Sequence, residues 1–431
     1  MEKSNWPAPA YSLILLLFFI STCSFLSASA ASSSSSSVLN DSMMYWNHRW
    51  VPQHRKKGGR VQYVTHNVLH YGAKADGVSD STAAFSQAWE EACKSWRPAS
   101  VYVPRGTYML KPIVFYGPCQ SKMLFHVEGK VVGPKHYWEF GKSGFWILFY
   151  KLEKLTILGG TYDAQGSDYW ACRRSQSQCT QGTKSITIIQ SRNVVVKGLK
   201  SLNPQMFHLA IDHCHQVLLK KLYIEAPSRS LNTDGIHIMS SEGITIAGAV
   251  IKTGDDCIAI GPGTKNVHIR GVHCGPGHGI SIGSLGLHTH EAGVENVFVT
   301  DSVMTRTQNG LRIKSWGRKT TSFVRNVLFQ NIAMENSYNP IIIDQNYCPY
   351  NKNCPGMGSG VKITGVTYRN IHGTSASPIA VKFVCSASRP CTGLQLHNVK
   401  LTYHKAIASS VCTHAGGGVS GVVSPRSCFR K

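Results

Sequence analysis

The chain has 431 residues, and its 45 lysines and arginines outnumber its 22 aspartates and glutamates, giving a formal net charge of +23. A chain of this length can bury a large core. A surface with this charge attracts polyanions such as nucleic acid, anionic membranes or acidic polysaccharides. The same charge also favours solubility without any partner. Composition does not choose among these readings, so the compartment of the protein has to narrow them.

The first thirty residues have the three-part pattern of a secretory signal peptide. Lys3 precedes an apolar run from Leu13 to Ile20, and Ala28-Ser29-Ala30 supplies small residues for cleavage. A membrane anchor is the alternative, but this run is short for a bilayer span, and no later segment has a long uncharged apolar run. We therefore expect residues 1–30 to be removed. The mature protein should be secreted, without a membrane anchor and without a nucleic-acid partner.

The cysteines agree with export. Of the 14 cysteines, Cys23 lies in the signal peptide, so the mature chain keeps an odd number and at least one is unpaired or pairs with another chain. No two-residue cysteine spacing recurs, so neither a zinc site nor any other metal is expected. Three close pairs have the spacing of short-loop disulfides: Cys172/Cys179, Cys348/Cys354 and Cys385/Cys391.

Residues 31–65 are predicted to form a flexible leader. They contain the serine run Ser32–Ser37 and a basic stretch, His54–Arg60, and they lack helical or strand periodicity. Asn40-Asp41-Ser42 is an acceptor for N-glycosylation. The basic stretch either tethers the protein to an anionic matrix or is a solvated tail without function, and the sequence favours neither.

The folded region is predicted to span residues 66–431 and to open with one amphipathic helix. A helix ahead of many strands would cover the open end of a β-solenoid, where strand edges are otherwise exposed. Asp80 or Ser81 can cap this helix. Its apolar residues fall on one face, at Ala84, Phe85, Ala88, Trp89 and Ala92.

From Val101 to about Tyr403, short strands alternate with turns rich in Gly, Asn, Asp and Pro. Successive strands recur every 22 to 31 residues and fall into two columns. The first column starts at Leu209, Ile236, Ile258, Ile280, Leu311 and Ile341, and the second at Val217, Ile244, Val267 and Val297. Propeller blades need a longer repeat, and sandwiches seldom keep a column register. We therefore predict an all-β fold, a single-stranded right-handed parallel β-helix with a short N-terminal capping helix.

Two cations point outward at one place in the first column. In Leu311-Arg312-Ile313-Lys314, a period of two turns the aliphatic residues inward and Arg312 and Lys314 outward. A solvated basic strand is the alternative, but small residues on the preceding coils favour a groove floor with positive charge at one end, suited to a carboxylate. The residues in the same outward columns are His237, Ala259, Ser281, Met239, Gly261 and Gly283.

Three acids and a histidine occupy equivalent turns of adjacent coils. Asp234, Asp256 and His278 stand 22 residues apart, each two positions before an Ile-x-Ile strand, and Asp255 precedes Asp256. Each acid alone has the sequence context of a turn former. Together they can keep one carboxyl protonated as an acid and another ionised as a base. Cleavage of a glycosidic bond needs that division of labour.

These residues carry a resemblance to a known family. Four segments are similar to the signature segments of polygalacturonases, the family 28 glycoside hydrolases: Asn232-Thr233-Asp234, Gly254-Asp255-Asp256, Gly277-His278-Gly279-Ile280 and Arg312-Ile313-Lys314. Residues 274–286 (CGPGHGISIGSLG) resemble the plant branch. The resemblance runs from about His66 to the end of the chain. It implies a secreted enzyme of the plant cell wall that hydrolyses α-1,4-galacturonosyl linkages of demethylated homogalacturonan (pectin), an acidic polysaccharide, with inversion and without a cofactor.

The same resemblance implies roles for individual residues. Asp256 corresponds to the general acid, and Asp234 and Asp255 correspond to the pair that activates water. His278 corresponds to the residue that tunes the acid. The substrate-binding positions are Asn232, Arg312, Lys314 and Tyr347. We further expect the enzyme to act as a monomer.

Two features of the sequence leave alternatives open. Adjacent coils are about 4.8 Å apart, whereas inverting carboxylates lie about 6.5–9.5 Å apart, so inversion rests on the resemblance alone. Leu287–His290 and Ser315–Arg318, beside the groove, depart from the usual family wording, which leaves endo or exo action undecided. A calcium-dependent pectate lyase and a catalytically silent pectin-binding wall protein are the alternative functions.

Overall fold

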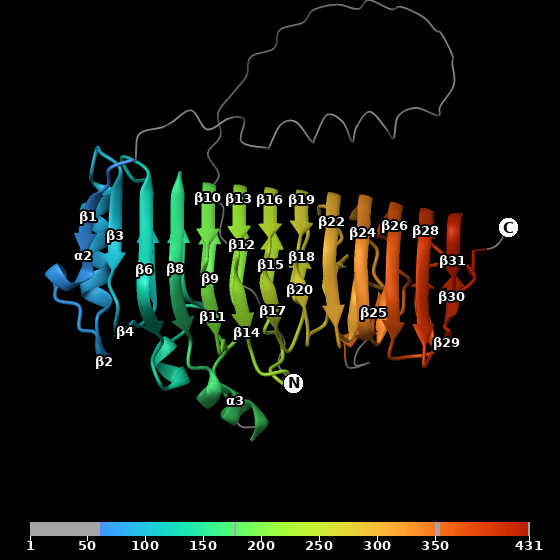
Figure 1. Ribbon diagram of the computed structural model, residues 1–431, viewed down its shortest axis with the longest axis horizontal. Coiled ribbons are helices and arrows are strands. Elements are labelled where there is room, and N and C mark those ends of the chain that lie inside the picture. Colours follow the sequence, from blue (N-terminus) through green and yellow to red (C-terminus); the bar gives the residue numbers. More distant parts are fainter. Residues whose placement is uncertain (1–60, 176–177, 350–353, 430–431) are drawn as a thin grey trace, which may run out of the picture. The chain divides into compact units, whose positions relative to one another are not determined.

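The computed structural model describes residues 61–175, 178–349 and 354–429. The signal peptide, most of the leader and the acceptor at Asn40 lie outside the described residues. The described strands stack as successive coils from helix α2 (Thr82–Cys93) at one end to strand β31 (Ala415–Ser424) at the other (Figure 1). The predicted all-β parallel β-helix with an N-terminal capping helix is confirmed.

One wall of the solenoid is a parallel sheet, here called sheet B, with one strand from each coil. Its spatial order follows the chain order, because each coil adds its strand beside that of the coil before. The strands are β5 (Ile113–Tyr116), β7 (Phe145–Tyr150), β9 (Lys184–Ile189), β12 (Leu209–Asp212), β15 (Ile236–Met239), β18 (Ile258–Ile260), β21 (Ile280–Leu285), β23 (Asn309–Trp316), β25 (Asn339–Tyr347), β27 (Ile379–Val384) and β30 (Ser409–Thr413).

The remaining walls form a second sheet, here called sheet A, which is parallel except where β28 pairs antiparallel with β29. Its strands are β1 (Val64–Asn67), β2 (Asp76–Asp80), β3 (Ala99–Val103), β4 (Thr107–Met109), β6 (Met123–Val132), β8 (Leu155–Asp163), β10 (Arg192–Lys197), β11 (Lys200–Leu202), β13 (His215–Lys220), β14 (Tyr223–Glu225), β16 (Glu242–Ala247), β17 (Val250–Lys252), β19 (Lys265–Arg270), β20 (His273–Cys274), β22 (Val294–Thr305), β24 (Phe323–Ser337), β26 (Lys362–Ser375), β28 (Cys391–Tyr403), β29 (Ala406–Ile407) and β31.

The register between coils is the one that the sequence columns predict. In sheet B, Ile236 pairs with Ile258, Ile258 with Ile280, and Ile280 with Leu311. In sheet A, the second column pairs in the same way through Ile244 and its neighbours on β13, β19 and β22. The column side chains are fully buried, so apolar residues of successive coils pile on one another inside the solenoid.

Sheet A bends at two corners where the backbone has positive φ. Asn266, Asn296 and Asn326 take this conformation at one corner, and each donates its side-chain amide to the coil before it. Asn331 and Asn370 do the same at the second corner. Asparagine tolerates the left-handed region and can also bond laterally, so a single residue both turns the chain and joins adjacent coils.

Helix α2 lies at the N-terminal end of the solenoid, as predicted (Figure 1). Its N-cap is Ser81, whose side chain makes no cap bond, and the carboxylate of the preceding Asp80 accepts the amide N–H of Thr82 at 3.0 Å. The buried face is the predicted one, and Trp89 packs against Phe115 with ring centroids 4.9 Å apart. The other helices are η1 (Val68–Tyr71), η2 (Tyr137–Phe140) and α3 (Ser167–Arg174). Among the described residues, none of the helices is long and apolar enough to cross a membrane.

The three disulfides predicted from close spacing are all present, and the structure adds three that spacing did not suggest. The additional bonds join cysteines on different coils or loops, 16 to 26 residues apart in sequence. They are Cys93–Cys119, Cys257–Cys274 and Cys412–Cys428. Cys214 is buried and is the free cysteine among the described residues, in agreement with the predicted unpaired cysteine.

We predict that the column residue Ile246 stabilises the solenoid far more than its outward neighbour Thr245. Ile246 is fully buried, so Ile246→Ala should lower the free energy of unfolding by about 2–5 kcal/mol through lost burial and a cavity. Thr245→Ala, on the same strand, should change it by less than about 0.5 kcal/mol. Urea unfolding with the disulfides intact measures the free energy of unfolding of both variants. Equal losses would contradict the assignment of Ile246 to the core and Thr245 to the surface.

Candidate active site

The turns that lead into sheet B bring the predicted site residues together. Asp234, Asp256 and His278 each stand two residues before a paired strand, so backbone pairing aligns them on three adjacent coils. Backbone bonds continue through the turns, from the amide of Gly235 to the carbonyl of Asp256 and from His278 to the carbonyl of Asp255. The structure therefore converts the 22-residue period into one cluster of side chains.

Asp256 lies at the centre of this cluster and is held by two cations. Its Oδ1 accepts hydrogen bonds from Arg312 Nη2 at 2.6 Å and from Ser281 Oγ at 2.8 Å. Its Oδ2 accepts one from Lys314 Nζ at 2.8 Å. Asp256 is 1% exposed, and both cations are themselves largely buried. The two cations project outward from the core as predicted, and both are bonded to Asp256.

This environment keeps Asp256 ionised. Burial opposes ionisation, but the charges of Arg312 and Lys314 and the hydrogen bonds from Lys314 and Ser281 outweigh it, so the pKa of Asp256 lies well below its usual range. These partners hold Asp256 in the ionised form that a base or an anchor for the cations has to have. The role of proton donor, which the family resemblance gives to Asp256, instead requires a carboxyl group that carries a proton.

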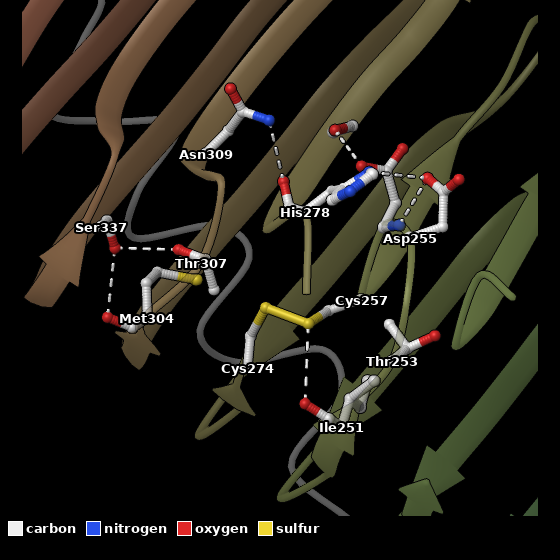
Figure 2. The surroundings of a disulfide bond; sticks show 12 residues. Ile251, Thr253, Asp255, Cys257, Cys274, His278, Met304, Thr307, Asn309 and Ser337 are labelled. Carbon is white, nitrogen blue, oxygen red and sulfur yellow. Dashed lines mark hydrogen bonds and ion pairs between the residues drawn. A yellow bond between two sulfur atoms is a disulfide. The ribbon is translucent and has the colours of Figure 1, made fainter. Parts of the chain in front are cut away.

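Asp255 has different partners and more access to solvent. His278 Nδ1 lies 3.2 Å from Asp255 Oδ1, and the Asp255 side chain is 17% exposed (Figure 2). Backbone amides supply the other bonds, from Asp256 to Oδ1 and from Asn232 to Oδ2. Burial raises the pKa of Asp255, but the hydrogen bond from His278, together with the charges of His278 and Lys314, outweighs it, so the pKa is lowered. His278 therefore contacts Asp255 rather than Asp256.

Asp234 is the acid that resists ionisation. It is 5% exposed, and burial raises its pKa; the hydrogen bond from His237 opposes this shift, and the nearby charges of Asp255 and Asp256 reinforce it. His237 Nδ1 lies 2.9 Å from Asp234 Oδ2. The three carboxyl groups therefore differ in their readiness to hold a proton, although they lie in one cluster.

The predicted substrate-binding residues occupy two places. Tyr347 pairs with the coil of Lys314: its ring centroid lies 5.2 Å from Lys314 Nζ and 5.3 Å from the ring of Trp316. The Asn232 residue is exposed, and its backbone, at positive φ, points its amide to Asp255. Asn232 thus lies on the coil of Asp234, at one side of the carboxylate cluster. Tyr347 lies on the coil after that of Lys314, at the other side.

A disulfide links the backbone on both sides of the cluster. Cys257 directly follows Asp256, and Cys274 lies four residues before His278, so the bond joins two of the coils that carry site residues (Figure 2). Both cysteines are buried beneath the turn. The covalent link restricts relative movement of Asp255 and His278, whose side chains have to meet.

The donor set does not fit a calcium site. An oxygen of Asp255, an oxygen of Asp256 and a ring nitrogen of His278 lie within 4.8 Å of one another. Ca²⁺ takes six to eight oxygen ligands, whereas this group offers a nitrogen, and both oxygens of Asp256 already face positive side chains. The positive charges of Arg312 and Lys314 repel a second cation and attract an anion.

Two members of the site were not identified as functional from the sequence. His237 and Ser281 were noted only as occupants of an outward column, yet His237 bonds Asp234, and Ser281 bonds both Asp256 and Arg312 Nε. Their place in the same outward column as Arg312 was the sequence feature that could have identified them as site residues. The sequence did not reveal that a polar residue there would bond a carboxyl group of the neighbouring turn.

The chain resembles known proteins over most of its length. Residues 93–421 match the family model described as Glycosyl hydrolases family 28, and residues 65–120 match one described as Rhamnogalacturonase A/epimerase, pectate lyase-like. A polygalacturonase of Prunus persica is 51% identical over 85% of this chain and 94% of its own. An exopolygalacturonase of Platanus acerifolia is 38% identical over 83% and 96%.

Solved structures have the same fold at lower identity. An endo-xylogalacturonan hydrolase from Aspergillus tubingensis superposes with a TM-score of 0.74 at 24% identity, over 84% of this chain and all of the other. A polygalacturonase from Erwinia carotovora ssp. carotovora gives a TM-score of 0.65 at 23% identity, over 85% and 99%.

We predict that Lys314→Met destabilises the protein at pH 7 and that this effect shrinks in acid. A carboxyl group whose pKa is lowered by folding adds stability above its unfolded pKa of about 3.9, and that stability is lost as the pH falls toward the folded pKa. Removing one cation should lower the free energy of unfolding by about 1–3 kcal/mol at pH 7 and by less at pH 3.

Urea unfolding at several pH values measures this difference. Lys154→Met is the matched control, because Lys154 makes an exposed ion pair with Glu153 at 3.6 Å. That variant should stay within about 0.5 kcal/mol of the parent at every pH. A loss in Lys314→Met that grows toward acid pH would contradict the ionised state of Asp256.

Proposed function

The chain belongs to glycosyl hydrolase family 28 and is a pectin-degrading polygalacturonase, and from this premise we propose how its residues cleave the galacturonan chain. The observation that carries the proposal is the pairing of Asp256 with Arg312 and Lys314 beside the separate pair of Asp255 and His278. Asp256 is held in its ionised form by two cations, whereas Asp255 contacts an imidazole. Glycoside hydrolysis needs one carboxyl group that stays ionised as a base and one that donates a proton as an acid.

Arg312 and Lys314 bind the carboxylate of the galacturonate unit at the point of cleavage. Each substrate unit carries one carboxylate, and an arginine fork with an adjacent ammonium group suits such an anion. Tyr347, in contact with Lys314, adds an apolar face for the sugar ring. Exposed Asn232 can bond the substrate from the opposite side of the cluster. The net charge of +23 helps to retain the protein on its acidic polymer.

We assign the proton donor to Asp255 in place of Asp256. Asp255 is the more exposed of the two, and His278, itself partly exposed, can pass it a proton from solvent. The charge of Lys314 contributes to lowering the pKa of Asp255, so a substrate carboxylate that neutralises Lys314 raises that pKa. Asp256 remains ionised by its contact with Arg312.

Asp234 and Asp256 activate the attacking water. One of them accepts a proton as the water oxygen bonds to the anomeric carbon, and Asp255 gives its proton to the departing glycosidic oxygen as the old bond breaks. Attack from the face opposite the leaving group inverts the configuration at that carbon. Water thus supplies the hydroxyl group and Asp255 the hydrogen of the new chain end, which balances the reaction without a cofactor.

The compartment and organisation belong to the same proposal. The signal pattern of residues 1–30, the disulfides and the acidic polymer substrate fit an extracellular enzyme of the plant cell wall. Residues 31–65 act as its leader, and residues 66–431 form one catalytic unit that works as a monomer.

We predict that Asp255→Asn and Asp256→Asn each lower the release of reducing ends from polygalacturonate by about 10²–10⁴-fold. A substrate with a good leaving group separates the two roles. On an aryl oligogalacturonide whose phenol leaves without protonation, Asp255→Asn should regain most activity, because no acid is needed, whereas Asp256→Asn should remain inactive. The reverse pattern would return the donor role to Asp256.

The products identify the reaction type and the mode of attack. Hydrolysis predicts saturated products and full activity in the presence of a chelator, whereas a lyase would give unsaturated, ultraviolet-absorbing products and depend on calcium. Chromatography of early products from polygalacturonate distinguishes exo action, which releases monomer alone, from endo action, which releases mixed oligomers. Binding without any product would indicate a catalytically silent wall protein and would overturn the proposal.

A further inference from the structure

A base that takes a proton from water must be ionised before it can act, and Asp234 lies where ionisation is hardest. It is almost fully buried, and two other acids, Asp255 and Asp256, are close enough to raise its pKa. Unlike Asp256, it is bonded to no arginine or lysine in the part of the chain that the structure describes. Within the described residues, the only side chain that bonds the Asp234 carboxyl group is His237.

The position of His237 is fixed from two sides. Its Nδ1 lies 2.9 Å from Asp234 Oδ2. Its ring stacks on Phe207, with centroids 4.2 Å apart and an interplanar angle of 8°. Phe207 stands two residues before strand β12, the same turn position that Asp234 holds on the next coil. The aromatic ring therefore occupies the equivalent turn and holds the imidazole plane toward the carboxyl group.

The other charged groups near this pair make their bonds elsewhere, which leaves His237 as the group that offsets the negative charge of Asp234. On the preceding coil, His208 turns its ring to Ser201, and burial lowers its pKa to about 3, so it carries no positive charge toward Asp234. Lys184 lies over the ring of Phe207, with its Nζ 6.0 Å from the ring centroid. On the following coil Ala259 stands in register with His237, and beyond it Arg312 and Lys314 are bonded to Asp256.

We propose that His237 is a positioning residue for the hydrolysis, which donates its Nδ1 hydrogen to Asp234 and so keeps that carboxyl ionised and directed toward the attacking water, with Phe207 fixing the imidazole. This inference rests on the proposed function, since it assigns a partner to one of the two water-activating acids. His237 itself makes no bond to the reacting atoms. Its role resembles that of the aspartate that orients histidine in a catalytic triad, with the two residue types exchanged.

The sign of the expected effect follows from the hydrogen bond. The bond from His237 lowers the pKa of Asp234 against the raising effect of burial. Without it, the pKa of Asp234 rises further, and a higher pH is needed to ionise the base. The acidic limb of the pH profile of kcat/KM should therefore move to higher pH, while the alkaline limb, which reports the proton donor, should stay where it is.

The test compares three variants of the secreted enzyme on polygalacturonate. His237→Leu removes the donor and should move the acidic limb upward by about one pH unit. His237→Asn places an amide N–H near the position of Nδ1 and should restore the limb to within a few tenths of a unit. His215→Leu is the control: His215 also faces an acid, Glu242, at 3.7 Å, but on sheet A, and its removal should leave the profile unchanged.

Each outcome bears on the proposal. An unmoved acidic limb in His237→Leu with a uniformly lower kcat would mean a purely structural role and would overturn the inference, as would failure of His237→Asn to restore the limb. Should His237→Leu not fold, His237→Gln replaces it, because its longer side chain carries the amide beyond the position of Nδ1. A parent enzyme that releases no reducing ends would instead refute the proposed function, so the two failures are distinguishable.

Discussion

Backbone hydrogen bonding between successive coils is the constraint on which the rest of the structure depends. Parallel pairing holds Ile236, Ile258 and Ile280 in one register. A slip of one residue on any coil would move its buried side chains to the surface and its outward side chains into the core. The aliphatic column makes such a slip costly because every member is buried. The same register fixes the turn before each strand, so the positions of the three carboxyl groups follow from the packing of the core.

Burial then determines the chemistry of those carboxyls. Taking three acids out of water is unfavourable unless each has a partner, and the site gives each acid a different one: cations for Asp256, His278 for Asp255 and His237 for Asp234. In two of the three cases the partners come from later coils: His278 from the next coil, and Arg312 and Lys314 from the one after it. A single column of similar turns therefore yields carboxyl groups with distinct proton affinities, and the proposed mechanism depends on these differences.

The sequence predicts the periodic part of this molecule well and the side-chain contacts poorly. The strand columns, the capping helix, the outward direction of Arg312 and three disulfides follow from periodicity and spacing, because a solenoid maps chain position almost directly onto space. The bond of His278 to Asp255 in place of Asp256 did not follow, since two adjacent residues in a turn point in different directions that no period describes. The cross-coil bond Cys257–Cys274 was missed for a similar reason: its partners are distant in sequence and meet only through the stacking of coils.

The asparagine corners have a consequence for how such an enzyme can diversify. The positive-φ residues of the two corners stand five positions apart on coil after coil, as in Asn193 and Gly198, Asn266 and Gly271, and Asn326 and Asn331. The wall of sheet A between the two corners therefore has a constant length. The variation in coil length falls in the remaining segments of each coil, which connect this wall with sheet B. Those segments border the outward face that carries the carboxylates and cations. Insertions and deletions in these segments can therefore reshape the surface around the carboxylates without changing the wall that holds the coils in register. The segments are suitable places to engineer a new substrate preference.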